Sequence, residues 1–177
     1  GFCIIEMMFD ETSRPINYRF LEMNPVFEKQ TGLKNAANKT VLQLLPGHSD
    51  HWFEIYGKVA ITGEPVRLIQ KSLTLGRWYD VYAFLGGEKG DNRVAVLFTD
   101  ITERKNAEEA IRQSEQNLRN MILQAPIAMA ILRGPSFVVE IANERMFELW
   151  GRGAGELLNK CIFDGLPEVR DQGYEEI

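Results

Sequence analysis

The stretch Phe98-Thr99-Asp100-Ile101-Thr102-Glu103-Arg104-Lys105 marks a change of pattern from strand to helix. The segment before it, Arg93–Thr99, is apolar and strand-like, whereas apolar residues after it recur at steps of three and four. Asp100 and Glu103 have the spacing of a capping box, in which two side chains satisfy free backbone amides at a helix start. We therefore expect a sheet domain to end here and a helix to begin.

The residues before this stretch predict an α+β domain. Apolar segments predict five strands, at Phe2–Phe9, Ile16–Met23, Val66–Leu75, Trp78–Leu85 and Arg93–Thr99. Helical spacing and turn residues predict helices at Pro25–Thr31, Val41–Leu45 and His51–Thr62. We expect a five-stranded antiparallel sheet with short helices inserted between strands 2 and 3.

The residues after this stretch predict a helical linker. A heptad seam is formed by Arg104, Ala107, Ile111, Ser114, Leu118, Met121 and Ala125, with charged or amide residues between them. A helix over residues 104–124 would be about 32 Å long, and Pro126 ends it. The seam favours a parallel two-chain coiled coil; the alternative is a single amphipathic helix packed on one domain.

The chain contains an internal repeat. The segment from Asn24 to Gly32 has a counterpart from Asn143 to Gly151, each running from an expected helix N-cap to an expected C-cap. Further matches pair Asn38-Lys39 with Asn159-Lys160 and Leu45-Pro46 with Leu166-Pro167. We interpret the second copy as the first half of a second domain, with strands expected at Ile127–Leu132 and Phe137–Ala142.

The motif at residues 98–105 and the charged heptad helix after it resemble the carboxy-terminal signature and signalling linker of PAS domains. In the second copy, residues 124–131, 159–163 and 166–169 resemble the first strand and middle helices of a following PAS domain. The resemblance implies a complete PAS domain over residues 1–102, a coiled-coil linker over 103–125, and the first half of a second PAS domain over 126–177.

The resemblance also implies a function. Tandem PAS modules sense a small ligand or relay a signal through a homodimer and linker to an output domain in the same chain. A histidine kinase of a two-component system is the first expectation, and a diguanylate cyclase is an alternative. Another alternative is a ligand-free constitutive dimerisation scaffold. This stretch of chain shows no nucleophile–base pair, so we expect no catalytic residue in it. Asp100, Thr102 and Arg104 would form the signal junction.

Composition excludes some classes of protein. The 177 residues carry a net charge of −5, which argues against a basic nucleic-acid module. The apolar runs are too short to span a membrane. Cys3 and Cys161 form no disulfide framework, which favours a reducing, cytoplasmic compartment.

Neither haem nor flavin is expected. Photoreactive flavin-binding PAS domains carry an Asn-Cys-Arg-Phe-Leu-Gln motif, whereas this chain has Asn38-Lys39-Thr40-Val41-Leu42-Gln43, without a thiol. Haem-binding members use a histidine on the long helix, and His51, with His48 just before it, lies at the start of that helix. A lone histidine there is more often a surface or capping residue. No cluster with metal-ligand spacing is present.

Charge alternation assigns the faces of two strands. Burying Asp80 unpaired would be costly, so the opposite face of its strand should point inward. The same logic turns Arg67 and Lys71 outward. The candidate pocket residues are therefore Tyr79, Val81, Ala83, Leu68, Gln70, Ser72 and Phe98. The outer face would carry an aromatic patch of Trp78, Tyr82 and Phe84, and exposed apolar patches mark interfaces. With Ile111, Leu118 and Met121 of the linker seam, this patch is the expected dimer interface.

Overall fold

The structure, a computed structural model, describes residues 1–168, and residues 169–177 of the expected half domain lie outside the described part. The chain divides into two compact units, of which the first comprises Gly1–Ala107 and the second begins at Glu108. Each unit has its own cluster of buried apolar side chains.

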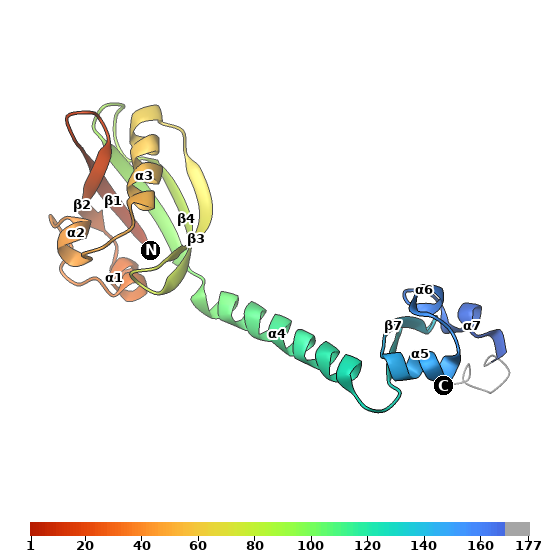
Figure 1. Ribbon diagram of the computed structural model, residues 1–177. Coiled ribbons are helices and arrows are strands. Elements are labelled where there is room, and N and C mark those ends of the chain that lie inside the picture. The colour runs from red at the N-terminus through yellow and green to blue at the C-terminus, as the bar shows by residue number, and fades with distance from the viewer. Residues whose placement is uncertain (169–177) are drawn as a thin grey trace. The chain divides into compact units, whose positions relative to one another are not determined.

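The first unit is an α+β domain built on a five-stranded antiparallel sheet. Its strands are β1 (Phe2–Phe9), β2 (Pro15–Met23), β3 (Val66–Ser72), β4 (Arg77–Leu85) and β5 (Arg93–Asp100). The strand order is β2-β1-β5-β4-β3, so β5 is central and pairs with β1 and β4. Three helices connect β2 to β3, namely α1 (Pro25–Thr31), α2 (Val41–Leu44) and α3 (Asp50–Thr62), and α3 lies across the sheet (Figure 1). The predicted sheet, with helices inserted between strands 2 and 3, is confirmed.

Local signals in the sequence account for the helix boundaries. The side chain of Asn24 accepts a hydrogen bond from the Phe27 amide at the start of α1, and Gly32 ends the helix in the left-handed conformation at φ 76°. Strand β3 is shorter than predicted and ends at Ser72 rather than Leu75. Residues 73–76 instead form a turn in which Gly76 has φ 65°, a conformation that glycine adopts without steric cost.

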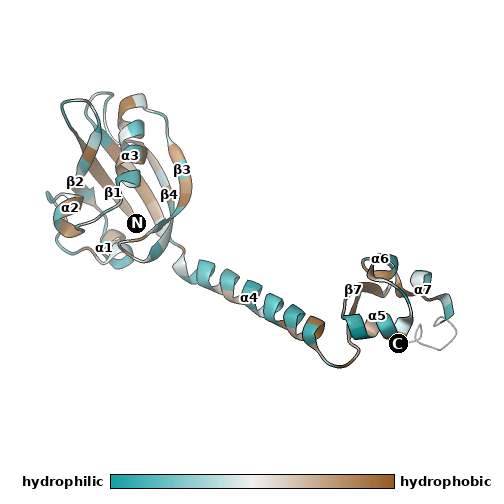
Figure 2. Ribbon diagram, in the orientation of Figure 1, coloured by the Kyte–Doolittle hydropathy of each residue, from teal (hydrophilic) through white to brown (hydrophobic). Residues whose placement is uncertain are grey.

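The core of the first unit lies between the inner face of the sheet and the helices. Alternation along β4 buries Tyr79, Val81 and Ala83, whereas Asp80 and Tyr82 face outward. On α3 the buried residues recur at helical spacing and include Trp52, Phe53 and Tyr56. Figure 2 shows the strands as more hydrophobic than the helix α4 (Thr102–Gln124), which follows β5. The predicted face assignment is confirmed.

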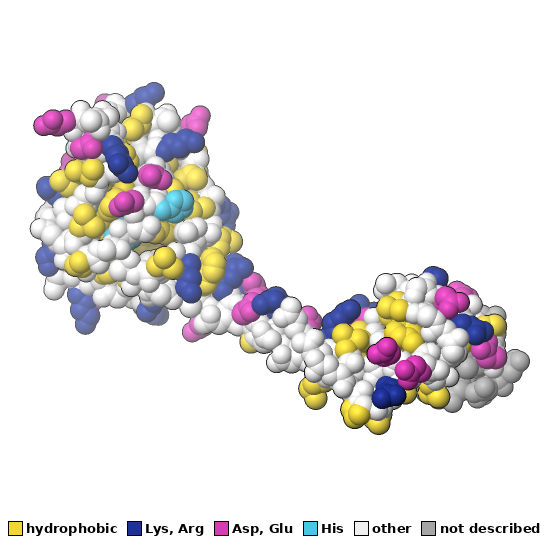
Figure 3. All heavy atoms as spheres, viewed as in Figure 1, with side chains coloured by type: hydrophobic (Ala, Val, Ile, Leu, Met, Phe, Trp, Pro, Cys, Tyr) yellow, Lys and Arg dark blue, Asp and Glu magenta, His cyan; other side chains and the backbone are white. Residues whose placement is uncertain are grey.

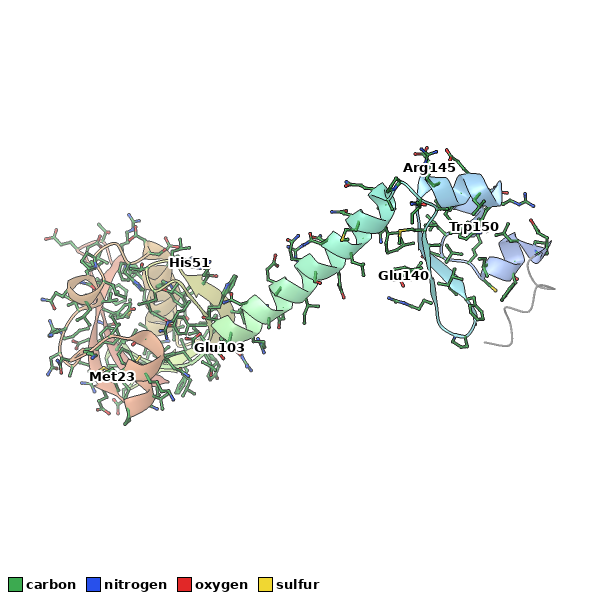
Figure 4. All side chains as sticks on the ribbon, turned by 90° about the horizontal axis from the view of Figure 1, so that it is seen from below. Met23, His51, Glu103, Glu140, Arg145 and Trp150 are labelled. Carbon is green, nitrogen blue, oxygen red and sulfur yellow. The ribbon has the colours of Figure 1, made fainter. Side chains whose placement is uncertain are left out.

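Helix α4 begins differently from the prediction. The Asp100 Oδ1 atom accepts hydrogen bonds from the Thr102 amide (2.9 Å) and the Thr102 hydroxyl (2.6 Å). The predicted capping box between Asp100 and Glu103 is therefore wrong, because Asp100 satisfies the amide two residues ahead of it. Glu103 lies in the first turn of α4 (Figure 4), where a carboxylate favours the positive end of the helix dipole.

The second unit repeats the opening of the first. It contains a two-stranded sheet of β6 (Ala130–Arg133) and β7 (Val138–Ala142), then α5 (Glu144–Trp150), α6 (Ala154–Leu157) and α7 (Ile162–Gly165). Asn143 caps α5 as Asn24 caps α1, and Asn38 and Asn159 have φ 62° and 61°. These backbone matches confirm the repeat, and the described residues 126–168 contain no counterpart of α3 or β3–β5.

Within the described residues, no helix is long and apolar enough to cross a membrane. On the face of the first unit seen in Figure 3, acidic and basic side chains are interspersed.

Candidate functional site

A cavity of about 70 Å³ lies inside the first unit, between the inner face of the sheet and the helices. Its wall combines aliphatic side chains with the aromatic residues Tyr18, Phe20, Phe27, Trp52, Tyr56, Tyr79 and Phe98. Several of these rings meet edge to face, for example Tyr18 and Tyr56 with centroids 5.7 Å apart. Such packing defines the shape of the cavity closely, because edge-to-face pairs have preferred geometry.

The titratable groups in the cavity wall are uncharged at neutral pH. Burial raises the pKa of the Cys3 thiol to about 12 and the pKa values of Tyr18 and Tyr56 well above their usual value. Burial also lowers the pKa of His48 to about 4, so its imidazole is neutral. No lysine, arginine, aspartate or glutamate lines the cavity among the described residues. The site is therefore suited to an uncharged molecule.

His48 is the polar side chain that stands out in this wall. It is 9% exposed, and its Nε2 atom lies 3.1 Å from the Tyr18 hydroxyl. Its Nδ1 atom is buried without a hydrogen-bond partner in the described part of the chain. By contrast, His51, which the sequence considered as a haem ligand, is exposed at the start of α3 (Figure 4). The sequence favours His51 over His48 as a candidate because His48 precedes the expected helix and is not part of its pattern of apolar residues.

The structure brings four of the seven predicted pocket residues together in the cavity wall, namely Ser72, Tyr79, Val81 and Phe98. Leu68, Gln70 and Ala83 face inward but do not line the cavity. Leu68 and Gln70 are half-exposed on β3, the edge strand, and Ala83 is fully buried in the core. The Ser72 hydroxyl accepts a hydrogen bond from the Leu75 amide at 3.3 Å, in the turn after β3.

A network of hydrogen bonds runs from the cavity wall to α4. The Tyr79 hydroxyl donates to the backbone oxygen of Gln30 at 2.8 Å, and Arg77 Nη1 donates to the same oxygen at 2.6 Å. Arg77 Nη1 also pairs with Asp100 Oδ2 at 3.0 Å. The Thr102 hydroxyl donates to Asp100 Oδ1 and accepts from the amide of residue 78 at 2.9 Å. Each step is a direct hydrogen bond, so the network connects the cavity wall to the start of α4 without a gap.

Of the predicted junction residues, Asp100 and Thr102 belong to this network. Burial raises the pKa of Asp100, but the hydrogen bonds from Thr102 and the charge of Arg77 together outweigh it and hold this pKa below its usual value. Arg104 acts elsewhere, because its charge helps lower the pKa of Asp80 after the larger effect of the Arg67 hydrogen bond. Arg77 and Gln30 were missed by sequence reasoning, because a backbone carbonyl acceptor leaves no trace in a sequence.

The outer face of the sheet differs in part from the predicted aromatic patch. Tyr82 is 38% exposed, whereas Trp78 and Phe84 are less exposed than Tyr82. The apolar residues Ile69 and Leu97 are more exposed than Tyr82. This face also carries a hollow of about 330 Å³ whose wall includes Phe2, Arg67, Asp80, Tyr82 and Leu97. Arg67 pairs with Asp80 through two hydrogen bonds, so the outward charge of Asp80 is paired.

The predicted heptad seam is exposed in the single chain. Ile111, Leu118 and Met121 are 62%, 53% and 71% exposed. Apolar side chains this exposed on a polar helix mark a surface that another protein surface can cover.

No family model matches this chain, and no curated protein matches it significantly. Within the described residues, no group of three or more histidine, cysteine or carboxylate side chains is placed to hold a metal ion.

Proposed function

We propose that the first unit is a PAS-type sensory domain, whose internal cavity binds a small molecule and whose state is passed to α4. The observation that carries this proposal is the continuous chain of contacts from Tyr79 in the cavity wall, through the Gln30 carbonyl and Arg77, to Asp100 and Thr102. A ligand that moves the aromatic wall would displace Tyr79 and thereby change the contacts that hold the start of α4. Such a shift requires that the ligand bind one arrangement better than the other.

In this proposal the protein is a homodimer, formed through the exposed seam of α4 and the apolar outer face of the sheet, and the signal changes the arrangement of that dimer. Support comes from the exposure of Ile111, Leu118 and Met121 and from the heptad spacing. The resemblance of residues 98–105 to the PAS signature supports an output domain in the same cytoplasmic protein, with a histidine kinase as the first candidate. The described residues supply the input and the linker of such a protein.

The test measures the distance between the two α4 helices of a dimer before and after the cavity is altered. Spin labels at Glu115→Cys, in a Cys161→Ser background, would report the distance between the two α4 helices of a dimer. Val96→Leu adds a methylene inside the cavity, where Val96 is 3% exposed, and should shift that distance. The shift should vanish when Asp100→Asn is added. A distance that stays constant in the folded, dimeric Val96→Leu protein would contradict the relay and favour a constitutive scaffold.

A further inference from the structure

The unpartnered nitrogen of His48 indicates the hydrogen-bonding group that a ligand of the cavity should carry. Nδ1 of His48 makes no hydrogen bond in the described part of the chain, although the residue is 9% exposed and its ring lines the cavity. Buried polar groups in folded proteins nearly always have a partner, because burial removes water without replacing its hydrogen bond. A partner from outside the chain is therefore expected at this atom.

The contact with Tyr18 determines which ring nitrogen carries the proton. If Nε2 carried it, Nε2 would donate to the Tyr18 oxygen 3.1 Å away, and both the phenol proton and Nδ1 would lack partners. If the Tyr18 hydroxyl donates to Nε2 instead, the phenol proton is satisfied and the Nδ1 hydrogen is the one unmatched donor of this pair. The second arrangement leaves fewer unsatisfied groups. Nδ1 is therefore a donor, and its missing partner is an acceptor.

The size and polarity of the cavity limit that acceptor further. A cavity of about 150 Å³ admits benzene, so on the same scale about 70 Å³ suits roughly three or four non-hydrogen atoms. Because the wall contains no charged side chain among the described residues, a charged ligand would be buried without a counter-ion, which is unfavourable.

We propose that this cavity binds a small uncharged molecule of three or four non-hydrogen atoms, with one carbonyl or hydroxyl oxygen that accepts a hydrogen bond from Nδ1–H of His48. This inference rests on the proposed sensory function, since it names the ligand class of the same cavity. Tyr18 is a positioning residue, because its hydroxyl fixes the tautomer of His48. The apolar remainder of the ligand packs against the aromatic wall.

Two probes of equal shape test the proposal, namely acetone and isobutene, in which a methylene group replaces the carbonyl oxygen. In protein with ¹⁵N-labelled histidine, ring shifts should show His48 Nδ1 protonated, and acetone should shift that signal. Acetone should bind roughly tenfold more tightly than isobutene, the effect of about one hydrogen bond. Four atoms bind no tighter than about tens of micromolar, so titrations must reach millimolar concentrations.

Variants separate the hydrogen bond from the volume of the cavity. His48→Phe should abolish the preference for acetone, and Tyr18→Phe should reduce it several-fold and give a mixture of ring tautomers. His51→Phe, at an exposed position of α3, should change neither.

Three results would overturn the proposal: an unprotonated Nδ1 in the unaltered protein, isobutene binding as tightly as acetone, or no shift with either probe. All three are read on the unaltered chain, so they stand even if His48→Phe fails to fold. Acetone binding without any change between the α4 helices would contradict the relay and leave the ligand class intact. A linker response without acetone binding would do the reverse.

Discussion

The Nη1 atom of Arg77 lies 3.0 Å from the Oδ2 atom of Asp100, and the same nitrogen donates to the backbone oxygen of Gln30 at 2.6 Å. Gln30 lies in the last turn of α1, where backbone carbonyls lack partners within the helix. One guanidinium on β4 therefore joins the end of α1 to the last residue of β5. Because α4 starts two residues after Asp100, the side chain of Arg77 connects the end of α1 to the start of that helix.

Asp100→Ala should destabilise the first unit by about 1–2 kcal/mol, because it removes the acceptor for the Thr102 amide and the partner of Arg77. The matched control is Asp80→Ala, which also breaks an arginine–aspartate pair, with Arg67. That pair is at the surface, and its loss should be small and should disappear at high salt. Urea denaturation measures both, and equal losses would contradict a special role for Asp100.

Stability should depend on pH through His48. Burial lowers its pKa to about 4, against 6.5 for the ordinary side chain. Between these values the unfolded chain binds a proton that the folded chain does not, so stability falls as pH drops from about 6.5 to 4. The loss should reach about 3 kcal/mol at most. His48→Phe should flatten this part of the profile. A profile unchanged by His48→Phe would show that another group dominates.

Charges on the seam of α4 should weaken dimerisation. Ile111→Glu with Leu118→Glu places two carboxylates where the helices are proposed to meet, and desolvating them without partners is costly. Gln113→Glu with Asn120→Glu adds the same charge at the same spacing on the opposite side of the heptad. Sedimentation should show a weaker dimer or a monomer for the first variant alone. A dimer unaffected by the seam charges would exclude the seam as the interface.

Asn143 should tolerate aspartate far less than Asn24 does. Both side chains accept a helix-capping hydrogen bond through Oδ1, but Asn143 also donates from Nδ2 to the carbonyls of Ile122, Ala125 and Ile127 at 3.1, 3.3 and 2.7 Å. Asn143→Asp would face three oxygens with a buried carboxylate and should cost about 3 kcal/mol or more.

Asn24→Asp is the control, since aspartate caps helices well. The Nδ2 atom of Asn24 makes no hydrogen bond within the described residues. In thermal unfolding, Asn143→Asp should therefore lower the midpoint of the second unit, whereas Asn24→Asp should leave the midpoint of the first unit nearly unchanged. Similar effects of the two substitutions would show that the carbonyl contacts contribute little.

Amides of β6 and β7 should exchange with solvent much faster than those of Val94–Phe98. Strand β5 is paired on both sides, whereas β6 pairs only with β7 in the described part of the chain, and a two-stranded sheet is marginal in water. An extension by about fifty residues should slow the exchange of β6 if it supplies further strands. Equal, strong protection of both sheets in the chain of 177 residues would contradict this prediction and show that contacts other than the β6–β7 pairing stabilise β6.

Local signals in the sequence were enough to predict the order of the elements, the inner face of the sheet and the repeat. These depend on local chemistry: alternation assigns Tyr79 and Val81 to one side of β4, asparagine acceptors begin helices at Asn24 and Asn143, and Gly32 ends one. Such signals involve residues close in the chain, so no knowledge of the fold is needed to interpret them.

Which distant residues meet depends on the packing of the whole domain. Gln30, Arg77 and Asp100 belong to three elements, and their contacts depend on strand register and on the position of α1. From the sequence, His51 was the candidate histidine because it lies on a helix. In the structure, the chain path between α2 and α3 brings His48 against Tyr18 and leaves His51 exposed. Spacing along a chain predicts a face, but partners distant in sequence are chosen by packing, which is a property of the whole domain.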